Sequence, residues 1–189
     1  MAIEIPQYDV LKKNGRFELR KYKSYITASV KITADSYNSA SNKAFRLLAD
    51  YIFGNNTKST KIAMTASVTS EKSETIAMTA PVAASRLNSQ TYVISFTMPS
   101  KYSMESLPRP NNNAVIINFT PSHEEAVVRF SGYTDEGKIE ELDAKLREWA
   151  SENQIKLTGD PTVSRYDPPW KPGFLRRNEI SLKSINSVN

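Results

Sequence analysis

Side chains that bind metals tightly or act as nucleophiles are scarce in this 189-residue chain. It contains no cysteine and a single histidine, His123. Without thiolates it cannot form disulfides, iron–sulfur clusters or cysteine-based catalytic sites, and one histidine cannot complete a three-histidine zinc site. His123 lies in the polar stretch TPSHEEAV, which predicts a solvated turn before a strand. We therefore expect no catalytic residues and no metal site, and we do not expect an enzyme.

One unusual pentapeptide, IAMTA, occurs twice, at residues 62–66 and 76–80. Apolar and small residues alternate within each copy, so the two copies predict a β-hairpin with a polar turn between them. One face of that hairpin would present Ile62, Met64, Ile76 and Met78. Because apolar alternation mostly indicates burial, we expect Met64 and Met78 to be core residues. A methionine-lined pocket wall is the alternative.

The elements that must position such residues are visible in the hydrophobic pattern. Alternating apolar residues predict strands at residues 26–32, 92–98, 115–119, 126–130 and 180–182. Helical spacing predicts one helix over residues 36–53, capped by Asp35 and closed by Gly54. A second helix is expected from Thr134 or Asp135, and its buried face is formed by Ile139, Leu142, Leu146 and Trp149. Each helix follows a strand and precedes further strands, which predicts an α+β domain with an antiparallel sheet and two similar halves.

Composition and charge set further limits. Because no linker or low-complexity stretch interrupts it, we expect the chain, residues 1–189, to form one domain. The formal net charge is +5, but the basic residues are spread out and carry no nucleic-acid-binding signature, so we expect no nucleic-acid partner. No segment approaches the roughly 18 to 20 apolar residues of a membrane span, and MAIEIPQYDV lacks the pattern of a secretory signal. We expect a cytoplasmic monomer that does not bind membranes.

Several segments together resemble the SOUL/haem-binding protein family. They are KIAMTASV, IAMTAPV, FTMPSKYSMESLPRP, AVVRFSGY and RYDPPWKPGFLRRNEI, in that order. The first two form a paired signature in the family and the last contains a second one, and this chain departs at Ser67, where proline is usual. The resemblance implies a distorted antiparallel β-barrel of two similar halves with two α-helices packed on it, similar to bacterial effector-binding domains.

The resemblance also implies non-enzymatic binding of haem or a related tetrapyrrole in an apolar pocket, as a carrier or buffer, without a strong axial ligand. In the family, that pocket lies between the first helix and the proline-rich loop. Lys171 matches a basic position suited to a propionate. Asn42 stands where family members carry an arginine, so Lys43 or Arg46 would supply that charge. The apolar slot would be lined by Phe45, Met64 and Trp170.

Other interpretations remain open for the proline-rich loop and for the function. For Arg176, Arg177 and Glu179 we favour structural ion pairs that help to close the barrel. For Trp170 and Lys171, a rigid clasp and a binding loop are equally consistent with the stiff sequence YDPPWKPGF. A binding module for another apolar or cationic small molecule would suit the same architecture, and a protein-interaction domain is the third alternative.

Overall fold

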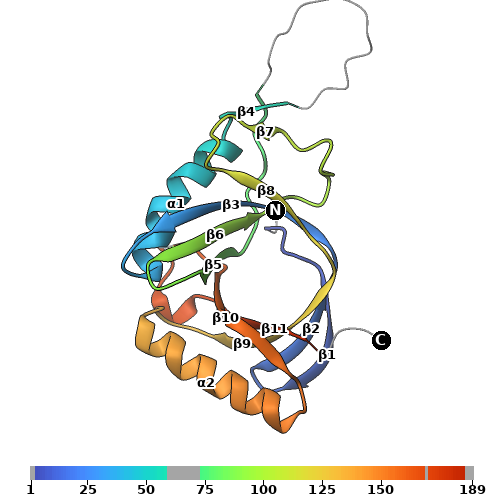
Figure 1. Ribbon diagram of the computed structural model, residues 1–189, viewed down its shortest axis with the longest axis vertical. Coiled ribbons are helices and arrows are strands. Elements are labelled where there is room, and N and C mark those ends of the chain that lie inside the picture. The colour runs from blue at the N-terminus through green and yellow to red at the C-terminus, as the bar shows by residue number, and fades with distance from the viewer. Residues whose placement is uncertain (1–2, 59–72, 169, 186–189) are drawn as a thin grey trace, which may run out of the picture.

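The computed structural model describes residues 3–58, 73–168 and 170–185, and among these the main element is one antiparallel sheet. Its strand order is β1-β2-β9-β11-β10-β5-β6-β3-β8 (Figure 1). The strands are β1 (Tyr8–Asn14), β2 (Phe17–Tyr22), β3 (Tyr25–Thr33), β5 (Val82–Arg86), β6 (Thr91–Thr97), β8 (Ile116–Thr120), β9 (His123–Phe130), β10 (Leu157–Arg165) and β11 (Asn178–Ser184). Two short strands, β4 (Asn56–Thr57) and β7 (Arg109–Pro110), pair separately. The helices are α1 (Tyr37–Ile52), α2 (Glu136–Glu152) and the 3-10 helix η1 (Gly173–Leu175).

The strand order divides the sheet into two equivalent halves that meet between β10 and β5. One half contains β3, α1, β5 and β6, and the other contains β9, α2, β10 and β11 in the same chain order. The strand that precedes each half in the chain pairs with the other half. β2 precedes β3 but pairs with β9, and β8 precedes β9 but pairs with β3. The predicted α+β fold of two similar halves is therefore confirmed. The exchanged strands, which the sequence pattern did not reveal, tie the halves together.

The sheet curls strongly in Figure 1, but it does not close within the described residues. β1 and β8 are its edge strands, and they do not pair with each other. The expected barrel is therefore an open one. Phe119 on β8 is exposed, because an edge strand has a neighbour on one side only and leaves more of its surface uncovered.

Both helices begin at side-chain caps. Ser36, rather than the predicted Asp35, caps α1 by accepting a hydrogen bond from the Ser39 amide. Asp135 caps α2, as predicted, and accepts a 2.8 Å hydrogen bond from the Lys138 amide. α1 packs on β3 and β6, whereas α2 packs on β9, β10 and β11. In the described chain, neither helix combines the length and the apolar character that crossing a membrane requires.

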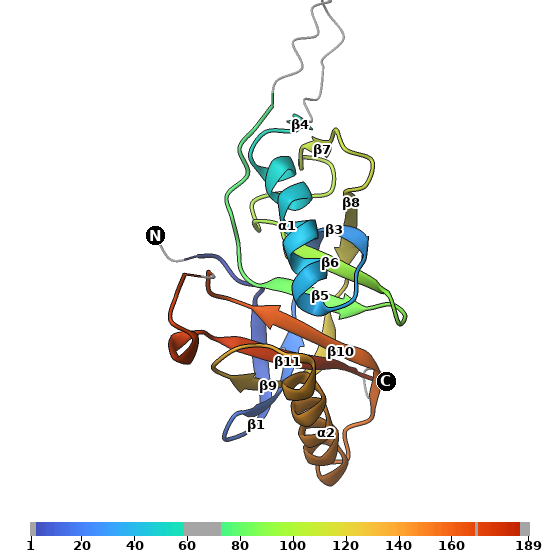
Figure 2. The ribbon, with the colours of Figure 1, turned by 90° about the vertical axis from the view of Figure 1, so that its left-hand side faces the viewer.

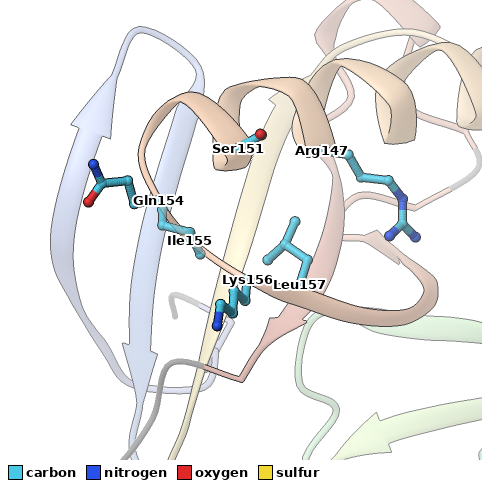
Figure 3. Close-up of a pocket in the computed structure, with 6 residues that line it drawn as sticks. All are labelled: Arg147, Ser151, Gln154, Ile155, Lys156 and Leu157. Atoms are coloured by element: carbon cyan, nitrogen blue, oxygen red, sulfur yellow. The ribbon is translucent and has the colours of Figure 1, made fainter.

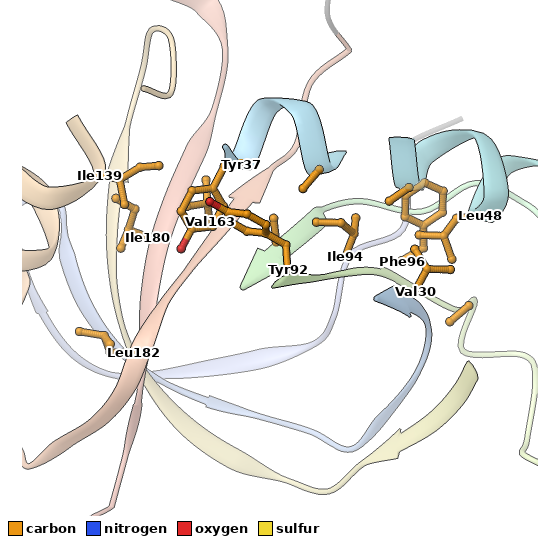
Figure 4. Packing of buried hydrophobic residues seen from close by; sticks show 14 of the residues in the cluster. Val30, Tyr37, Leu48, Tyr92, Ile94, Phe96, Ile139, Val163, Ile180 and Leu182 are labelled. Atoms are coloured by element: carbon orange, nitrogen blue, oxygen red, sulfur yellow. The ribbon is translucent and has the colours of Figure 1, made fainter. Parts of the chain in front are cut away.

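The apolar core continues from one half of the sheet to the other. Figure 4 shows Tyr37, Tyr92 and Val163 between core residues on the α2 side, such as Ile180, and those on the α1 side, such as Ile94. The rings of Tyr37 and Tyr92 meet edge to face, with their centroids 4.9 Å apart. This shared core supports our proposal that the chain folds as a single domain.

A buried ion network lies on the sheet face away from the helices. Arg20 of β2 is fully buried and donates to both carboxylate oxygens of Glu179 on β11, at 2.9 and 3.0 Å. The Arg20 Nε also donates to Glu18 Oε2 at 2.7 Å. Two further donors reach Glu179, the Tyr166 hydroxyl at 2.6 Å and the Arg177 Nη2 at 2.8 Å. The predicted structural ion pair between Arg177 and Glu179 is confirmed.

The network keeps its members charged despite their burial. Burial raises the pKa of Glu179, but hydrogen bonds and charge from Arg20, with hydrogen bonds from Tyr166 and Arg177, outweigh this effect and leave the pKa below its usual 4.5. Burial lowers the pKa of Arg20, and Glu179 in turn brings it above its usual range. Each ion thus depends on the other, because an unpaired buried charge would be strongly destabilising.

Replacing Glu179 with glutamine should destabilise the fold by about 3–5 kcal/mol at neutral pH, since Arg20 would stay buried without its charge partner. A carboxylate with a lowered folded-state pKa gives stability that is fully present above its unfolded pKa, near 4.5, and is lost as the pH falls through the folded value. Urea unfolding from about pH 3 to 7 should therefore show a steeper acid loss in the wild type than in Glu179→Gln.

Glu148→Gln, on the exposed surface of α2, is the matched control and should change neither the stability nor its pH dependence. If Glu179→Gln behaved like this control, the network would not be a determinant of the fold.

Candidate ligand-binding site

The residues predicted to bind the ligand lie on two elements, α1 and the loop of residues 166–177 between β10 and β11. Arg165, the last residue of β10, joins these elements, because its Nη2 donates to Asn38 Oδ1 in the first turn of α1 at 2.8 Å. Figure 2 shows the loop leaving β10 at the level where α1 begins and projecting from the sheet. The predicted residue Met64 lies outside the described residues. The point where the loop leaves β10 therefore lies beside the start of α1.

One flank of α1 faces β5. Asn38, Asn42 and Phe45 share this flank because they follow the i, i+4, i+7 spacing of a helix face. The Phe45 ring lies 5.6 Å from the ring of Phe96 on β6, the neighbour of β5. Arg165, the partner of Asn38, lies on β10. β10 pairs with the edge of β5 opposite to the one that pairs with β6. We call Asn38, Asn42 and Phe45 the β5-facing flank of α1.

The predicted cations of α1 do not lie on this flank. Lys43 points the other way, and its Nζ donates to the Thr33 carbonyl at the end of β3 at 3.3 Å. Arg46 lies on the solvent-exposed side of the helix. Phe45 thus lies on the β5-facing flank of α1, whereas Lys43 does not.

The second IAMTA copy does not form the predicted hairpin strand. Ile76 is buried and its amide donates to the Ile52 carbonyl at the end of α1, while the Ala80 amide donates to the Glu4 carbonyl. The Thr79 hydroxyl donates to the Thr97 carbonyl. These contacts turn Met78 outward, so that it is 44% exposed rather than buried as predicted. The first copy, residues 62–66, lies outside the described residues.

Residues 73–81 run from the end of α1 back to the start of β5, alongside α1 in Figure 2. Met78 therefore lies on a segment that is attached at both ends. The Ile76 amide bonds to Ile52 at the end of α1, and the other end continues into β5, where Val82 pairs with Phe96 of β6. Phe96 is also the contact of Phe45. Partly exposed apolar side chains from α1 and from this segment accordingly border the same side of the helix.

The proline-rich loop is held by its own polar contacts. Asp167 accepts hydrogen bonds from Lys171 Nζ at 2.8 Å and from the Arg177 amide at 2.6 Å. The Arg177 hydrogen bond and then the Lys171 contact bring the pKa of Asp167 below its usual value. The Arg176 Nε donates to the Lys171 carbonyl at 2.7 Å. Asp167 thus connects the start of the loop with Lys171 and with the end of the loop at Arg177, and the charge of Lys171 is already matched by Asp167.

Aromatic side chains project from this clasp. Trp170 is 84% exposed, and Phe174 and Tyr133 are also largely exposed. Tyr133 packs against the loop, since a Cβ added at Gly173 would lie 2.8 Å from its ring, and the Arg176 guanidinium lies 5.2 Å from the ring centroid. Sequence reasoning identified Trp170 but missed Tyr133, because that residue follows a strand and no local pattern connects it with the loop.

The sequence context of His123 predicted a solvated turn, and this prediction is wrong. His123 begins β9 and pairs with Tyr22 of β2, and its imidazole stacks on the Tyr22 ring with centroids 5.5 Å apart. Its Nδ1 contacts the Pro121 carbonyl at 2.8 Å, and its Nε2 contacts Glu125 Oε1 at 3.1 Å. Burial lowers the pKa of His123, but the contacts with Glu125 and Pro121 bring it above 6.5. Both ring nitrogens are therefore engaged by the protein itself.

A shallow pocket of about 390 Å³ lies elsewhere, between the C-terminal end of α2 and the start of β10 (Figure 3). It is lined by Arg147, Ser151, Gln154, Ile155, Lys156 and Leu157. None of the predicted site residues contributes to it. Within the described residues, no three His, Asp or Glu side chains gather as metal ligands would.

Comparison with known proteins identifies relatives along nearly the whole chain. Residues 3–183 match the family model described as SOUL heme-binding protein. Heme-binding protein 1 from Xenopus tropicalis is 28% identical over 170 residues, which cover 89% of this chain and 84% of that protein.

Solved structures show the same fold at much lower identity. The C-terminal domain of EcmrR aligns with a TM-score of 0.63 and 13% identity, over 94% of this chain and 97% of that chain. A hydrolase from Listeria innocua aligns with a TM-score of 0.55 and 10% identity, over 92% and 94% of the two chains. These likenesses support the fold only.

Proposed function

Because this chain belongs to the SOUL heme-binding protein family, we propose that it binds haem or a related tetrapyrrole without catalysing a reaction, as a carrier or buffer. The proposed site lies between the β5-facing flank of α1 and the loop 166–177. The observation that carries this placement is the hydrogen bond between Arg165 and Asn38, which fixes the end of β10, where the loop begins, to the start of the helix.

Exposed apolar side chains on α1, on the segment 73–81 and on the loop suit a flat macrocycle. Phe45 is 41% exposed on α1, Met78 lies on the neighbouring segment 73–81, and Trp170 projects from the loop. A soluble protein gains free energy when a ligand covers such surfaces, by about 25 cal/mol for each Å² of apolar area removed from water. Of the predicted residues, Phe45 and Trp170 therefore belong to the proposed site.

The stiffness of the loop favours binding. Asp167 joins its two ends through Lys171 and the Arg177 amide, and the Gly132 amide donates to the Gly173 carbonyl at 3.0 Å. Since the loop is already ordered, little conformational entropy remains to be lost when a ligand meets Trp170.

We propose that the iron receives no strong axial ligand from His123. Its Nδ1 and Nε2 contact Pro121 and Glu125, and its ring is stacked on Tyr22, so ligation would require both contacts to rearrange. Binding would then rest on burial of the macrocycle and on pairing of its propionates.

A protein-interaction role is the alternative that one observation favours, the exposure of Trp170, Phe174 and Tyr133 at the loop. Aromatic side chains are enriched where proteins bind one another. Tight hemin binding that depends on Phe45 of α1 as well as on Trp170 would favour the tetrapyrrole.

Removing either aromatic side chain should weaken hemin binding. Trp170→Ala and Phe45→Ala should each lower the affinity by about tenfold or more, that is by 1.4 kcal/mol or more, because each removes apolar contact with the ring. The measurement is a spectroscopic hemin titration, with thermal unfolding as the check on folding. Phe119→Ala, at an aromatic position on the edge strand β8 whose exposure lies between those of Phe45 and Trp170, should leave the affinity unchanged. Equal affinities for all four proteins would place the site elsewhere.

Iron should contribute little to the affinity. Metal-free protoporphyrin should bind within about a factor of ten, or 1.4 kcal/mol, of hemin. His123→Ala should leave the visible spectrum of the bound hemin unchanged. Loss of that spectrum in the variant, or failure of the iron-free ring to bind, would identify His123 as a ligand and contradict this view of the site.

A further inference from the structure

Unlike several other arginines, Arg165 has no carboxylate partner among the described residues. Arg20 and Arg177 both pair with Glu179, and Arg86 pairs with Glu136. Arg165 makes a single side-chain hydrogen bond, to the neutral amide oxygen of Asn38. Among the described residues, no Asp or Glu forms an ion pair with it.

The guanidinium of Arg165 is also withdrawn from water. The residue is half-buried, and its Nε is fully buried without a hydrogen-bond partner among the described residues. Burial, followed by the positive charge of Arg176, lowers the pKa of Arg165. Two cations thus lie near each other, and one of them has a buried donor, its Nε, that remains unused. Such a position is costly unless an anion compensates for it.

We infer that Arg165 is the anion-binding residue of the proposed site and that it pairs with a carboxylate at the edge of the bound ligand. This inference rests on the proposed function and assigns the polar end of the ligand to the start of α1. Lys171, the cation expected from the sequence, is already paired with Asp167, and Lys43 lies on the opposite flank of the helix. Arg165 replaces both in this role.

The position of Arg165 relative to the apolar residues fits an amphiphilic ligand. Its partner Asn38 precedes Phe45 by seven residues on the same flank, which is about 10 Å along a helix that rises 1.5 Å per residue. A ligand that covers Phe45 and Met78 with its ring would reach the start of α1 with its acidic edge. A guanidinium with free N–H groups is well suited to a carboxylate there, because it can donate two parallel hydrogen bonds.

The decisive comparison is between protoporphyrin, which carries two carboxylates, and its neutral dimethyl ester. The wild type should bind the diacid more tightly than the ester. Arg165→Met should weaken binding of the diacid by about 10- to 100-fold, the range for a hydrogen bond to a charged group, and should leave the ester unchanged. Arg165→Lys, which keeps the charge but not the planar donor fork, should retain part of the preference.

Arg147→Met, near the far end of α2, is the matched control and should bind both compounds as the wild type does. Circular dichroism and thermal unfolding check that each variant folds. If Arg165→Met discriminated between diacid and ester as strongly as the wild type, the inference would be overturned while the proposed function stood.

A second arm needs no tetrapyrrole. The Arg165 Nε–Hε resonance, assigned by its loss in Arg165→Met, should shift saturably with octanoate and not with octanol. If neither porphyrin bound but octanoate shifted this resonance, the proposed function would fail and the anion site would be supported. No saturable shift would overturn the anion site whatever the porphyrins did.

Discussion

The bidentate contact between Arg20 and Glu179 is the interaction on which the rest of the structure depends. It reaches across β9 from β2 to β11, and it places two opposite charges where neither ion would be stable alone. Glu179 also lies at the start of β11, directly after the proline-rich loop, and takes hydrogen bonds from Tyr166 and Arg177 at the two ends of that loop. The same carboxylate therefore joins the sheet and fixes both points from which the loop projects.

Charges around the loop consequently separate into two groups. Arg20, Arg177 and Lys171 each have a carboxylate partner and hold the framework. Within the described part of the chain, Arg165, between this framework and α1, has only the Asn38 side-chain amide as a polar partner. A protein that binds an acidic macrocycle needs both kinds, because the paired charges keep the aromatic residues in place and an unpaired one can meet the ligand. The proposed site is thus a consequence of how the clasp is anchored.

Much of this organisation could be predicted from the sequence. The amphipathic stripe of α2 and the Arg177–Glu179 pair were expected, because helical spacing and neighbouring opposite charges are local signals. Met78 and His123 were placed wrongly, because their burial depends on partners far away in sequence: the end of α1 turns Met78 outward, and Tyr22 covers His123. Arg165 was not singled out, since a missing partner becomes visible only when all the neighbours are known.

The central claim, that a tetrapyrrole lies between α1 and the loop 166–177, is tested most directly by comparing amide spectra of the protein bound to hemin and to zinc protoporphyrin. Paramagnetic iron broadens nearby resonances, whereas diamagnetic zinc does not. The account predicts selective loss of signals from the β5-facing flank of α1 and from the loop, with residues 151–157 beside the α2 pocket unaffected. Broadening centred on that pocket, or on the surroundings of His123, would contradict it.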